Sequence, residues 1–236
     1  ACDIESALSL LIKEASKYVW KPLPWLDRLR AELAAQNSFL ESLAVAETPM
    51  HPMFVHKTLS RFLRPDDFLV FDGGNFPAFA RVVHPASLPG RWHYLPSLGM
   101  LGSSIPTGLA AKLAHPESRV VVMTGDGAFG FNGMELDTAV RHNLPIVVVL
   151  GNDAAWGVDK HYQMGYYGRA IATDLNASHY EMVAQGLGAW GECVERPEDL
   201  APALERAFGC GRPALVNVMI QSAISPRAQF RLDTTK

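Results

Sequence analysis

Hydrophobic residues follow two alternating patterns along most of this chain, short continuous runs and longer stretches with helical spacing. Short runs rich in Val, Leu and Phe indicate strands that are buried on both faces. We expect strands at residues 68–71, 119–124, 145–150, 191–194 and 214–220. We expect helices at residues 52–63, 102–114, 133–142, 180–187 and 197–208. This alternation predicts an α/β fold, in which helices cover both faces of a parallel sheet.

The pattern is different at the beginning of the chain. Apolar residues at helical spacing predict a helix from Asp3, its N-cap, to Ser16, and a charged amphipathic helix from Leu26 to Leu43. These two helices would form a short helical linker in front of the main domain. We therefore divide the chain into residues 1–48, a main domain at residues 49–221 and a C-terminal tail at residues 222–236.

Composition narrows the class of protein. The chain has 236 residues, of which 48% are hydrophobic, and a formal net charge of -3, as in an ordinary globular domain with an appendage. This balance does not favour binding to nucleic acid or to an anionic membrane, and no apolar run is long enough to cross a bilayer. The start lacks the profile of a signal peptide. The three cysteines, an odd number without metal-ligand spacing, are most simply reduced thiols, so we expect a cytoplasmic protein.

Two carboxylates follow two neighbouring expected strands. Asp126 comes after the strand that ends at Thr124, and Asp153 comes after the next strand. Because parallel strands bring their carboxyl ends to the same edge of a sheet, both acids are expected there. Gly125 and Gly127 allow a tight turn, and a helix expected to begin near Phe131 would point its amides at the same place. Carboxylates and phosphate oxygens are ligands that Mg²⁺ prefers, so this spacing predicts a metal-bridged diphosphate.

Two further glycine-rich segments lie upstream. The segment at residues 95–111 contains many small residues, which permit close approach of a helix to a ligand or to another backbone. For Gly108 and Ala110, helix packing is the preferred interpretation. The loop at residues 71–76 follows a strand, and the backbone amides of Gly74 and Asn75, with the Asn75 side chain, are candidates for binding a terminal phosphate. Ordinary turn chemistry also explains Asp-Gly-Gly-Asn, so both interpretations stay open.

The segment GDGAFGFNGMELDTAVRHNLP, followed by GNDAAWG, resembles the cofactor motif of thiamine-diphosphate-dependent enzymes. It is most similar to the branch with acetolactate synthase, oxalyl-CoA decarboxylase, 2-hydroxyacyl-CoA lyase and benzaldehyde lyase. The likeness runs from about His51 to Ile220, and residues 1–48 resemble the end of the family's middle domain and the linker that leaves it. It implies the C-terminal, diphosphate-binding domain of such an enzyme, with the thiamine-diphosphate-binding fold and with thiamine diphosphate and Mg²⁺ as cofactors.

The resemblance also implies roles for individual residues. Asp126, Asp153 and the backbone carbonyl of Ala155 would be the metal ligands, and Asp153 stands where the family usually has Asn. The carbonyl of Gly99 would accept a hydrogen bond from the aminopyrimidine, and Leu101 would wedge between the two rings of the cofactor. The residues implied to bind the cofactor are Gly74, Asn75, Gly99, Leu101, Gly125, Asp126, Gly127, Ala128, Asp153, Trp156 and Gly157.

Relatives in this family are more than twice as long and begin with a pyrimidine-binding domain, whose glutamate activates the cofactor. We therefore expect no catalytic residue in this chain, and we do not assign Glu135 as a base. The expected partners are the missing pyrimidine-binding and middle domains, on the same or a separate chain. The resemblance implies a homo- or hetero-oligomer with the site at a subunit interface. We therefore expect the chain to be a fragment, a processed product or one chain of a split enzyme, and its non-Met start slightly favours the first two.

The implied activity is that of a lyase or carboligase, which breaks or forms a carbon–carbon bond beside a carbonyl. A small 2-keto acid or an acyl-CoA is the implied substrate, and the acetolactate-synthase-like and 2-hydroxyacyl-CoA lyase interpretations both stay open. The alternative is a noncatalytic cofactor-binding or dimerisation module that retains the fold. The tail is either a lid or thioester contact, through Arg227 and Arg231, or a frayed terminus. Candidate neighbours of a substrate are His161, Tyr162, Gln163 and Tyr167.

Overall fold

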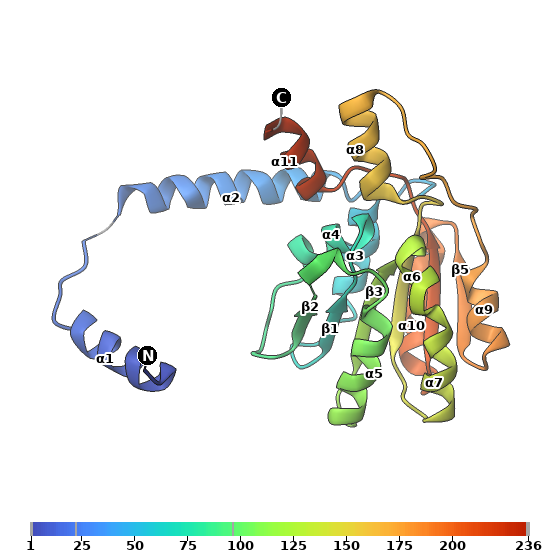
Figure 1. The fold of residues 1–236 in the computed structure, drawn as a ribbon, viewed down its shortest axis with the longest axis horizontal. Helices are drawn as coiled ribbons and strands as arrows, with labels where there is room; N and C mark the ends of the chain where they lie inside the picture. The colour runs from blue at the N-terminus through green and yellow to red at the C-terminus, as the bar shows by residue number, and fades with distance from the viewer. Residues whose placement is uncertain (1, 22, 96, 235–236) are drawn as a thin grey trace. The chain divides into compact units, whose positions relative to one another are not determined.

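The computed structural model describes residues 2–21, 23–95 and 97–234, and these divide into two compact units, Ala1–Glu41 and Ser42–Lys236 (Figure 1). The first unit contains α1 (Ile4–Ala15) and most of α2 (Pro24–Ser42), which confirms both helices expected there. Asp3 caps α1, because its carboxylate accepts a hydrogen bond from the Ser6 amide at 2.9 Å. The assignment of residues 1–48 to the end of a middle domain stays a prediction.

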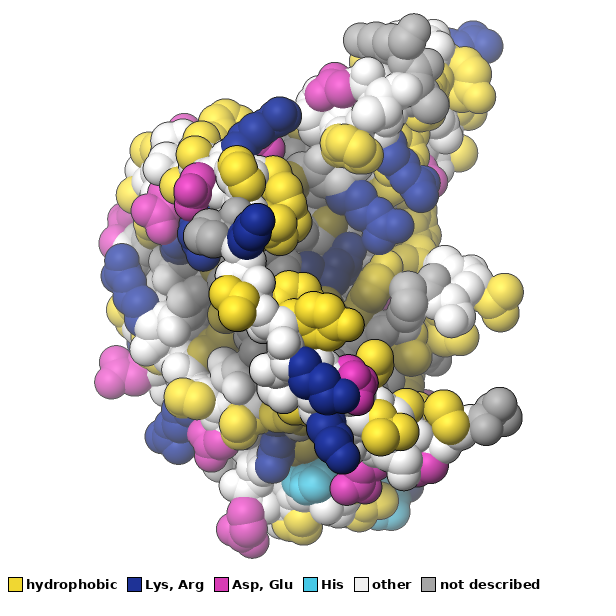
Figure 2. Space-filling model, turned by 90° about the vertical axis from the view of Figure 1, so that its left-hand side faces the viewer, with side chains coloured by type: hydrophobic (Ala, Val, Ile, Leu, Met, Phe, Trp, Pro, Cys, Tyr) yellow, Lys and Arg dark blue, Asp and Glu magenta, His cyan; other side chains and the backbone are white. Residues whose placement is uncertain are grey.

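Apolar side chains of the first unit are largely exposed. No described residue of α1 is buried, and Ile4, Leu8 and Leu11 are among its exposed residues. Figure 2 shows hydrophobic side chains exposed among Lys and Arg on the face that it draws. Within the described ranges, no helix combines the length and the apolar composition that a membrane span requires.

A six-stranded parallel sheet forms the centre of the second unit, as far as the structure describes it. Its strand order is β2-β1-β3-β4-β6-β5, and every pair of neighbours is parallel. The strands are β1 (Phe68–Phe71), β2 (Trp92–Tyr94), β3 (Val120–Gly125), β4 (Val147–Asn152), β5 (Trp190–Val194) and β6 (Ala214–Met219). This confirms the predicted α/β class and all five expected strands. The three-residue edge strand β2 was not predicted, because its Trp-His-Tyr sequence carries no apolar run.

Helices cover both faces of this sheet and create two hydrophobic layers. Alternate residues of each strand point to opposite faces, so Val121 and Met123 pack in one layer while Val120 and Val122 pack in the other. The first layer includes α3 (Pro52–Ser60), α4 (Asn75–Val83) and α10 (Pro197–Gly209). The second layer includes α5 (Ser104–Ala114), α6 (Asp126–Asn132), α7 (Leu136–Arg141) and α9 (Tyr180–Gly186).

Three predictions about local structure were wrong. The helix expected to begin near Phe131 begins at Asp126, directly after β3, because burial of Phe129 outweighs the low helix propensity of the glycines around it. No helix was expected at residues 158–174, but most of α8 (Gly157–Tyr167) lies there. The frayed-terminus alternative for the tail is wrong, because α11 (Pro226–Thr234) buries Ala228 and Leu232. The last two tail residues lie outside the described part of the chain.

Candidate functional site at the carboxyl edge of the sheet

A cavity of about 240 Å³ opens at the carboxyl ends of β1, β3 and β4. All residues predicted to bind a cofactor or metal line it: Gly74, Asn75, Gly99, Leu101, Gly125, Asp126, Gly127, Ala128, Asp153, Ala155, Trp156 and Gly157. The sequence did not single out the other lining residues, which are Gly73, Phe76, Tyr94, Met100, Gly151, Val158 and Asp159. The fold therefore brings together segments that are up to 86 positions apart, from Gly73 to Asp159.

The two carboxylates lie at adjacent strand ends, as the parallel register requires. Gly125 of β3 pairs with Gly151 of β4, and each strand delivers its aspartate just beyond this pair. Asp126 is only 2% exposed, and its carboxylate accepts hydrogen bonds from the amides of Gly127 at 2.9 Å and Ala155 at 3.1 Å. Asp153 Oδ2 is buried and has no hydrogen-bond partner among the described residues. A buried carboxylate oxygen without a donor is suited to a cation.

The protonation of both acids reflects their burial. Desolvation, reinforced by the charge of Asp153, raises the pKa of Asp126 to about 7. Desolvation also raises the pKa of Asp153 to about 6, although the nearby Ser222 side chain and Lys160 act in the opposite direction. Two carboxylates that both resist ionisation in one cavity would be stabilised in their charged form by a divalent cation.

Asp153, and not Asn152, faces this cavity. Asn152 is the last residue of β4 and is fully buried, and its amide donates to the Ser178 carbonyl at 3.1 Å and to Asn217 Oδ1 at 3.3 Å. Its Oδ1 accepts from the Ala154 amide at 3.2 Å, so Asn152 shapes the turn that carries Asp153. The side chain of Asn152 is thus occupied within the protein, and the oxygen available at this position belongs to Asp153.

Three helices begin at the cavity, and none of them has a side-chain cap. The N-cap residues are Gly74 for α4, Gly125 for α6 and Trp156 for α8, and all three line the cavity. The amino ends of helices carry partial positive charge and free amide groups, which favour anions such as phosphate. The same cavity therefore offers carboxylates for a cation and amide groups for an anion.

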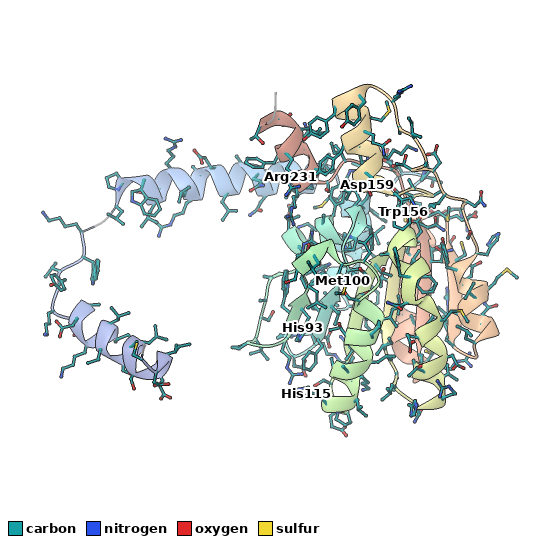
Figure 3. All side chains as sticks on the ribbon, in the orientation of Figure 1. His93, Met100, His115, Trp156, Asp159 and Arg231 are labelled. Atoms are coloured by element: carbon teal, nitrogen blue, oxygen red, sulfur yellow. The ribbon has the colours of Figure 1, made fainter. Side chains whose placement is uncertain are left out.

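Glycines make room for this arrangement at two positions. A Cβ atom at Gly127 would lie 2.7 Å from the Trp156 ring, and a Cβ atom at Gly157 would lie 2.9 Å from Asp153 Oδ2. Trp156 also packs edge-on against Phe131, with ring centroids 5.9 Å apart. Figure 3 shows Trp156 and Asp159 at the same end of the sheet, where β4 leads into α8. A side chain at either glycine would displace a wall of the cavity.

The buried carboxylate of Asp72, which the sequence did not single out, joins two loops of the cavity. Its Oδ1 accepts from the amides of Gly73 at 2.8 Å and Gly102 at 2.9 Å. Its Oδ2 accepts from Ser104 Oγ at 2.5 Å and more weakly from Thr124 Oγ1 at 3.3 Å. Asp72 is 1% exposed, so these donors replace its hydration. The loop after β1 and the loop before α5 are thus held together by one side chain.

The Asn75 side chain lines the cavity, but its amide already has partners within the chain. Its Nδ2 donates to the Ala223 carbonyl at 2.5 Å, and its Oδ1 accepts from the Ser225 amide at 3.1 Å. The backbone amides at the start of α4 are therefore the better candidates for an anion at this position.

Several other candidates lie apart from the cavity. Glu135 does not line the cavity, and its carboxylate accepts a hydrogen bond from Thr138 Oγ1 at 2.7 Å. Gln163 accepts from the Ile171 amide at 2.7 Å, and Tyr167 is exposed. His161 lies on α8 with a buried Nε2 that has no partner among the described residues. Of the four proposed substrate neighbours, Tyr162 lines a second cavity beside the first.

The donor set decides which kind of metal site this can be. Among the described residues, no group of three or more His, Cys, Asp and Glu side chains could hold a metal ion. Two carboxylates cannot fill the octahedron that Mg²⁺ requires, so the remaining ligands must be backbone carbonyls, water and oxygens of a bound molecule. The cavity therefore fits a cation that bridges the protein to an anionic ligand.

Comparisons with known proteins agree with this geometry. A family model described as thiamine pyrophosphate enzyme, C-terminal TPP binding domain, matches residues 72–218. The chain is 42% identical over 203 residues to a probable acetolactate synthase of Mycobacterium bovis, covering 85% of this chain and 37% of that protein. It is 31% identical over 226 residues to 2-hydroxyacyl-CoA lyase 2 of Homo sapiens, covering 92% of this chain and 35% of that protein.

A solved structure shares the fold. Benzoylformate decarboxylase from Polynucleobacter necessarius matches with a TM-score of 0.70 and 20% sequence identity, covering 76% of this chain and 35% of that chain. This chain therefore spans little more than a third of the length of these relatives.

Proposed function

The chain belongs to the thiamine pyrophosphate enzymes, as their C-terminal TPP-binding domain, and from this we propose that its cavity binds the diphosphate of thiamine diphosphate through Mg²⁺. One observation carries the proposal: the buried carboxylate of Asp126 and the partly buried carboxylate of Asp153, from adjacent strand ends, share a cavity, and Asp153 Oδ2 is buried without a partner among the described residues. The uncapped amino ends of α4, α6 and α8 would receive the phosphate oxygens.

Each lining residue has a place in this proposal. Asp126, Asp153 and the carbonyl of Ala155 would hold the metal ion. Gly99 and Leu101 would meet the rings of the cofactor, and Leu101 already packs over Gly73, where a Cβ atom would lie 2.5 Å from its Cδ2. The remaining proposed contacts are Gly74, Asn75, Gly125, Gly127, Ala128, Trp156 and Gly157.

These contacts separate the role of the cofactor from the role of the protein. Thiamine diphosphate supplies a carbanion that can add to a carbonyl, and the protein supplies binding, orientation and electrostatics. Asp126 and Asp153 would position the metal, the helix amides would fix the phosphates, and Trp156 would close one wall. The activating glutamate belongs to the pyrimidine-binding domain that the family resemblance implies, so this chain supplies half of the active site.

A titration with thiamine diphosphate, monitored by tryptophan fluorescence, tests the proposed binding directly. Trp156 lines the cavity, so thiamine diphosphate should change its emission when Mg²⁺ is present. Addition of EDTA should reverse the change, because the diphosphate would lose its bridge to the two aspartates. The emission of Trp156→Phe provides the background from the other tryptophans. An identical response with and without Mg²⁺ would contradict the proposed metal bridge.

Asp72→Asn tests whether the loops of the cavity depend on their shared carboxylate. The amide of asparagine places an N–H group against donors that now point at a carboxylate oxygen, so we expect the affinity for thiamine diphosphate to fall about tenfold. Calorimetry measures this change. Thr124→Val is the matched control, because the Thr124 hydroxyl makes only long hydrogen bonds, to Asp72 Oδ2 and to the Gly125 carbonyl, both at 3.3 Å. If wild type and Asp72→Asn bound thiamine diphosphate with equal affinity, Asp72 would not be needed to hold the loops of the cavity.

We also propose a carbon–carbon lyase or carboligase activity for the complete protein, on a 2-keto acid or an acyl-CoA. The support is similarity to a probable acetolactate synthase and to a 2-hydroxyacyl-CoA lyase. We expect negligible turnover by this chain alone and measurable turnover once the missing amino-terminal portion is supplied. A product screen with pyruvate, oxalyl-CoA and 2-hydroxyacyl-CoA would identify the substrate. Binding of the cofactor without turnover by the complete protein would favour a noncatalytic module.

The same proposal includes an oligomer with its site at a subunit interface, in the cytoplasm. Exposed apolar side chains beside the cavity support the interface, since Met100 lines the cavity and Phe131 packs against Trp156. Leu98, on the same loop as Met100, is 99% exposed. Apolar groups of this size at the mouth of a site are typical of surfaces that a second protein covers. Sedimentation of the complete protein with its cofactor would test this part.

A further inference from the structure

Three buried polar side chains form a line from α9 across β6 to the end of β4. They are Glu181 on α9, Asn217 on β6 and Asn152, the last residue of β4, and we call them the polar line. Buried polar groups cost free energy unless hydrogen bonds satisfy them. None of these three described residues lines the cofactor cavity, so the proposed cofactor contacts do not explain why polar groups are buried here.

Hydrogen bonds join the side chains of the polar line in sequence. Asn217 Nδ2 donates to Glu181 Oε2 at 2.7 Å, and Asn152 Nδ2 donates to Asn217 Oδ1 at 3.3 Å. Both amide groups also donate to the Ser178 carbonyl, at 3.3 Å from Asn217 and at 3.1 Å from Asn152. The other oxygen of Glu181 lies 2.9 Å from Nδ1 of His179, which is exposed. Each hydrogen of the two amide groups therefore has an acceptor.

The acceptors give the polar line one direction. A carboxylate and a backbone carbonyl only accept hydrogen bonds, so the NH₂ group of Asn217 faces Glu181 and Ser178. Oδ1 of Asn217 then faces Asn152 and directs the NH₂ group of Asn152 toward itself. This leaves Oδ1 of Asn152 to accept from the Ala154 amide, at 3.2 Å. Glu181 thus helps to fix an oxygen that lies two side chains away.

The Ala154 amide belongs to the turn that carries the proposed metal ligands. Asp153 precedes it, Ala155 follows it, and the Ala155 amide donates to Asp126 Oδ2 at 3.1 Å. Ala154 has a φ angle of 51°, in the left-handed region, which residues other than glycine adopt only when their surroundings hold them there. The hydrogen bond from Ala154 to Asn152 provides this support. Its loss would release the turn that places Asp153 beside Asp126.

We propose that Glu181 and Asn217 are positioning residues for the metal site, and that they act through Asn152 on the turn that carries Asp153. Residues that orient metal ligands without touching the metal contribute roughly 10- to 100-fold to metal affinity. The inference rests on the proposed function, since it concerns the Mg²⁺ of that same site. It requires that the direction of the hydrogen bonds, and not only the packing of the core, sets the affinity for the cofactor.

Calorimetry of thiamine diphosphate binding in the presence of Mg²⁺ tests the direction of the polar line. Asn217→Asp replaces the donor that faces Glu181 by a second carboxylate oxygen, so we expect the affinity to fall about tenfold. Addition of Glu181→Gln to this variant restores a hydrogen bond in the opposite sense, because the new amide donates to the new carboxylate. That carboxylate still accepts from Asn152. The double variant should therefore bind about threefold more tightly than Asn217→Asp, or better, which is the contribution of one hydrogen bond.

Three further variants separate positioning from general stability. Glu181→Gln alone should bind like wild type, because its side-chain oxygen accepts from Asn217. Val216→Ala is the matched control, since Val216 is buried on the same strand and faces the other hydrophobic layer. It should lower the melting temperature and leave the affinity unchanged. If circular dichroism shows that Asn217→Asp does not fold, Asn217→Ser takes its place, because it removes the amide without adding a charge, and the same loss is expected.

The outcomes distinguish this inference from the proposed function. Absence of Mg²⁺-dependent binding of thiamine diphosphate by wild type would refute the proposed function. If wild type binds the cofactor and a folded Asn217 variant binds it equally well, the positioning role alone is overturned. The same holds if the folded double variant recovers none of the affinity that Asn217→Asp loses.

Discussion

Asp126→Ala is expected to abolish Mg²⁺-dependent binding of thiamine diphosphate, lowering the affinity by roughly 100-fold or more, since even residues that only support a metal ligand contribute 10- to 100-fold. Asp126 comes directly after β3, is 2% exposed and lines the cavity, so its carboxylate is held at the proposed metal site. Its removal also leaves the amides of Gly127 and Ala155 without their acceptor. Calorimetry with thiamine diphosphate, in the presence and absence of Mg²⁺, measures the effect.

Asp66→Ala is the control for this variant. Asp66 is exposed and precedes β1, so it lies at the opposite edge of the sheet and should not affect binding. A circular dichroism spectrum would show whether Asp126→Ala keeps its fold. If a folded Asp126→Ala chain bound the cofactor with the affinity of wild type, the proposed metal site would be wrong.

Much of the fold could be predicted because the central strands have a distinctive sequence pattern. Val120–Val122 and Val147–Val149 lie in continuous apolar runs, which is the pattern of strands that are covered on both faces. The elements that were missed depend on tertiary contacts. Glycines lower the helix propensity of α6, so its sequence does not predict the helix that the burial of Phe129 stabilises. The helices α8 and α11 stabilise each other through the contact of Leu232 with Gly165. Local sequence does not contain that information.

Sequence likewise predicted some parts of the candidate site and missed others. The convergence of Asp126 and Asp153 follows from strand order alone, because both residues come directly after parallel neighbours. The role of Asp72 could not be read from Asp-Gly-Gly-Asn, which is ordinary turn chemistry, because its partners Gly102 and Ser104 are about 30 residues away. The cavity beside the candidate site is lined by residues of α4 and α11, which are more than 140 positions apart in the chain, so local sequence could not predict it.

Without metal and cofactor, Asp153→Asn is expected to be more stable than wild type at pH 8, by about 1–3 kcal/mol, because it removes one of two like charges in the same partly desolvated cavity. The folded-state pKa values, about 7 for Asp126 and about 6 for Asp153, lie above the ordinary value of 3.8. The folded chain therefore holds these protons more tightly than the unfolded chain. In wild type, the stabilisation that this proton binding gives the folded chain is complete below about pH 4 and is lost as the pH rises through 6 and 7.

Thermal melts of both chains at pH 5 and pH 8 measure this difference. Burial lowers the pKa values of His56 and His84, so these groups contribute the opposite pH dependence, but they are present in both chains and cancel in the comparison. The gain in stability from Asp153→Asn should be large at pH 8 and small at pH 5, where Asp153 is mostly protonated.

Mg²⁺ with thiamine diphosphate should stabilise wild type more than the variant, since it neutralises the carboxylates of Asp126 and Asp153. Asp66→Asn, changed at the opposite edge, should match wild type. An equal advantage at both pH values would show that the carboxylates of Asp126 and Asp153 do not repel each other in the folded chain.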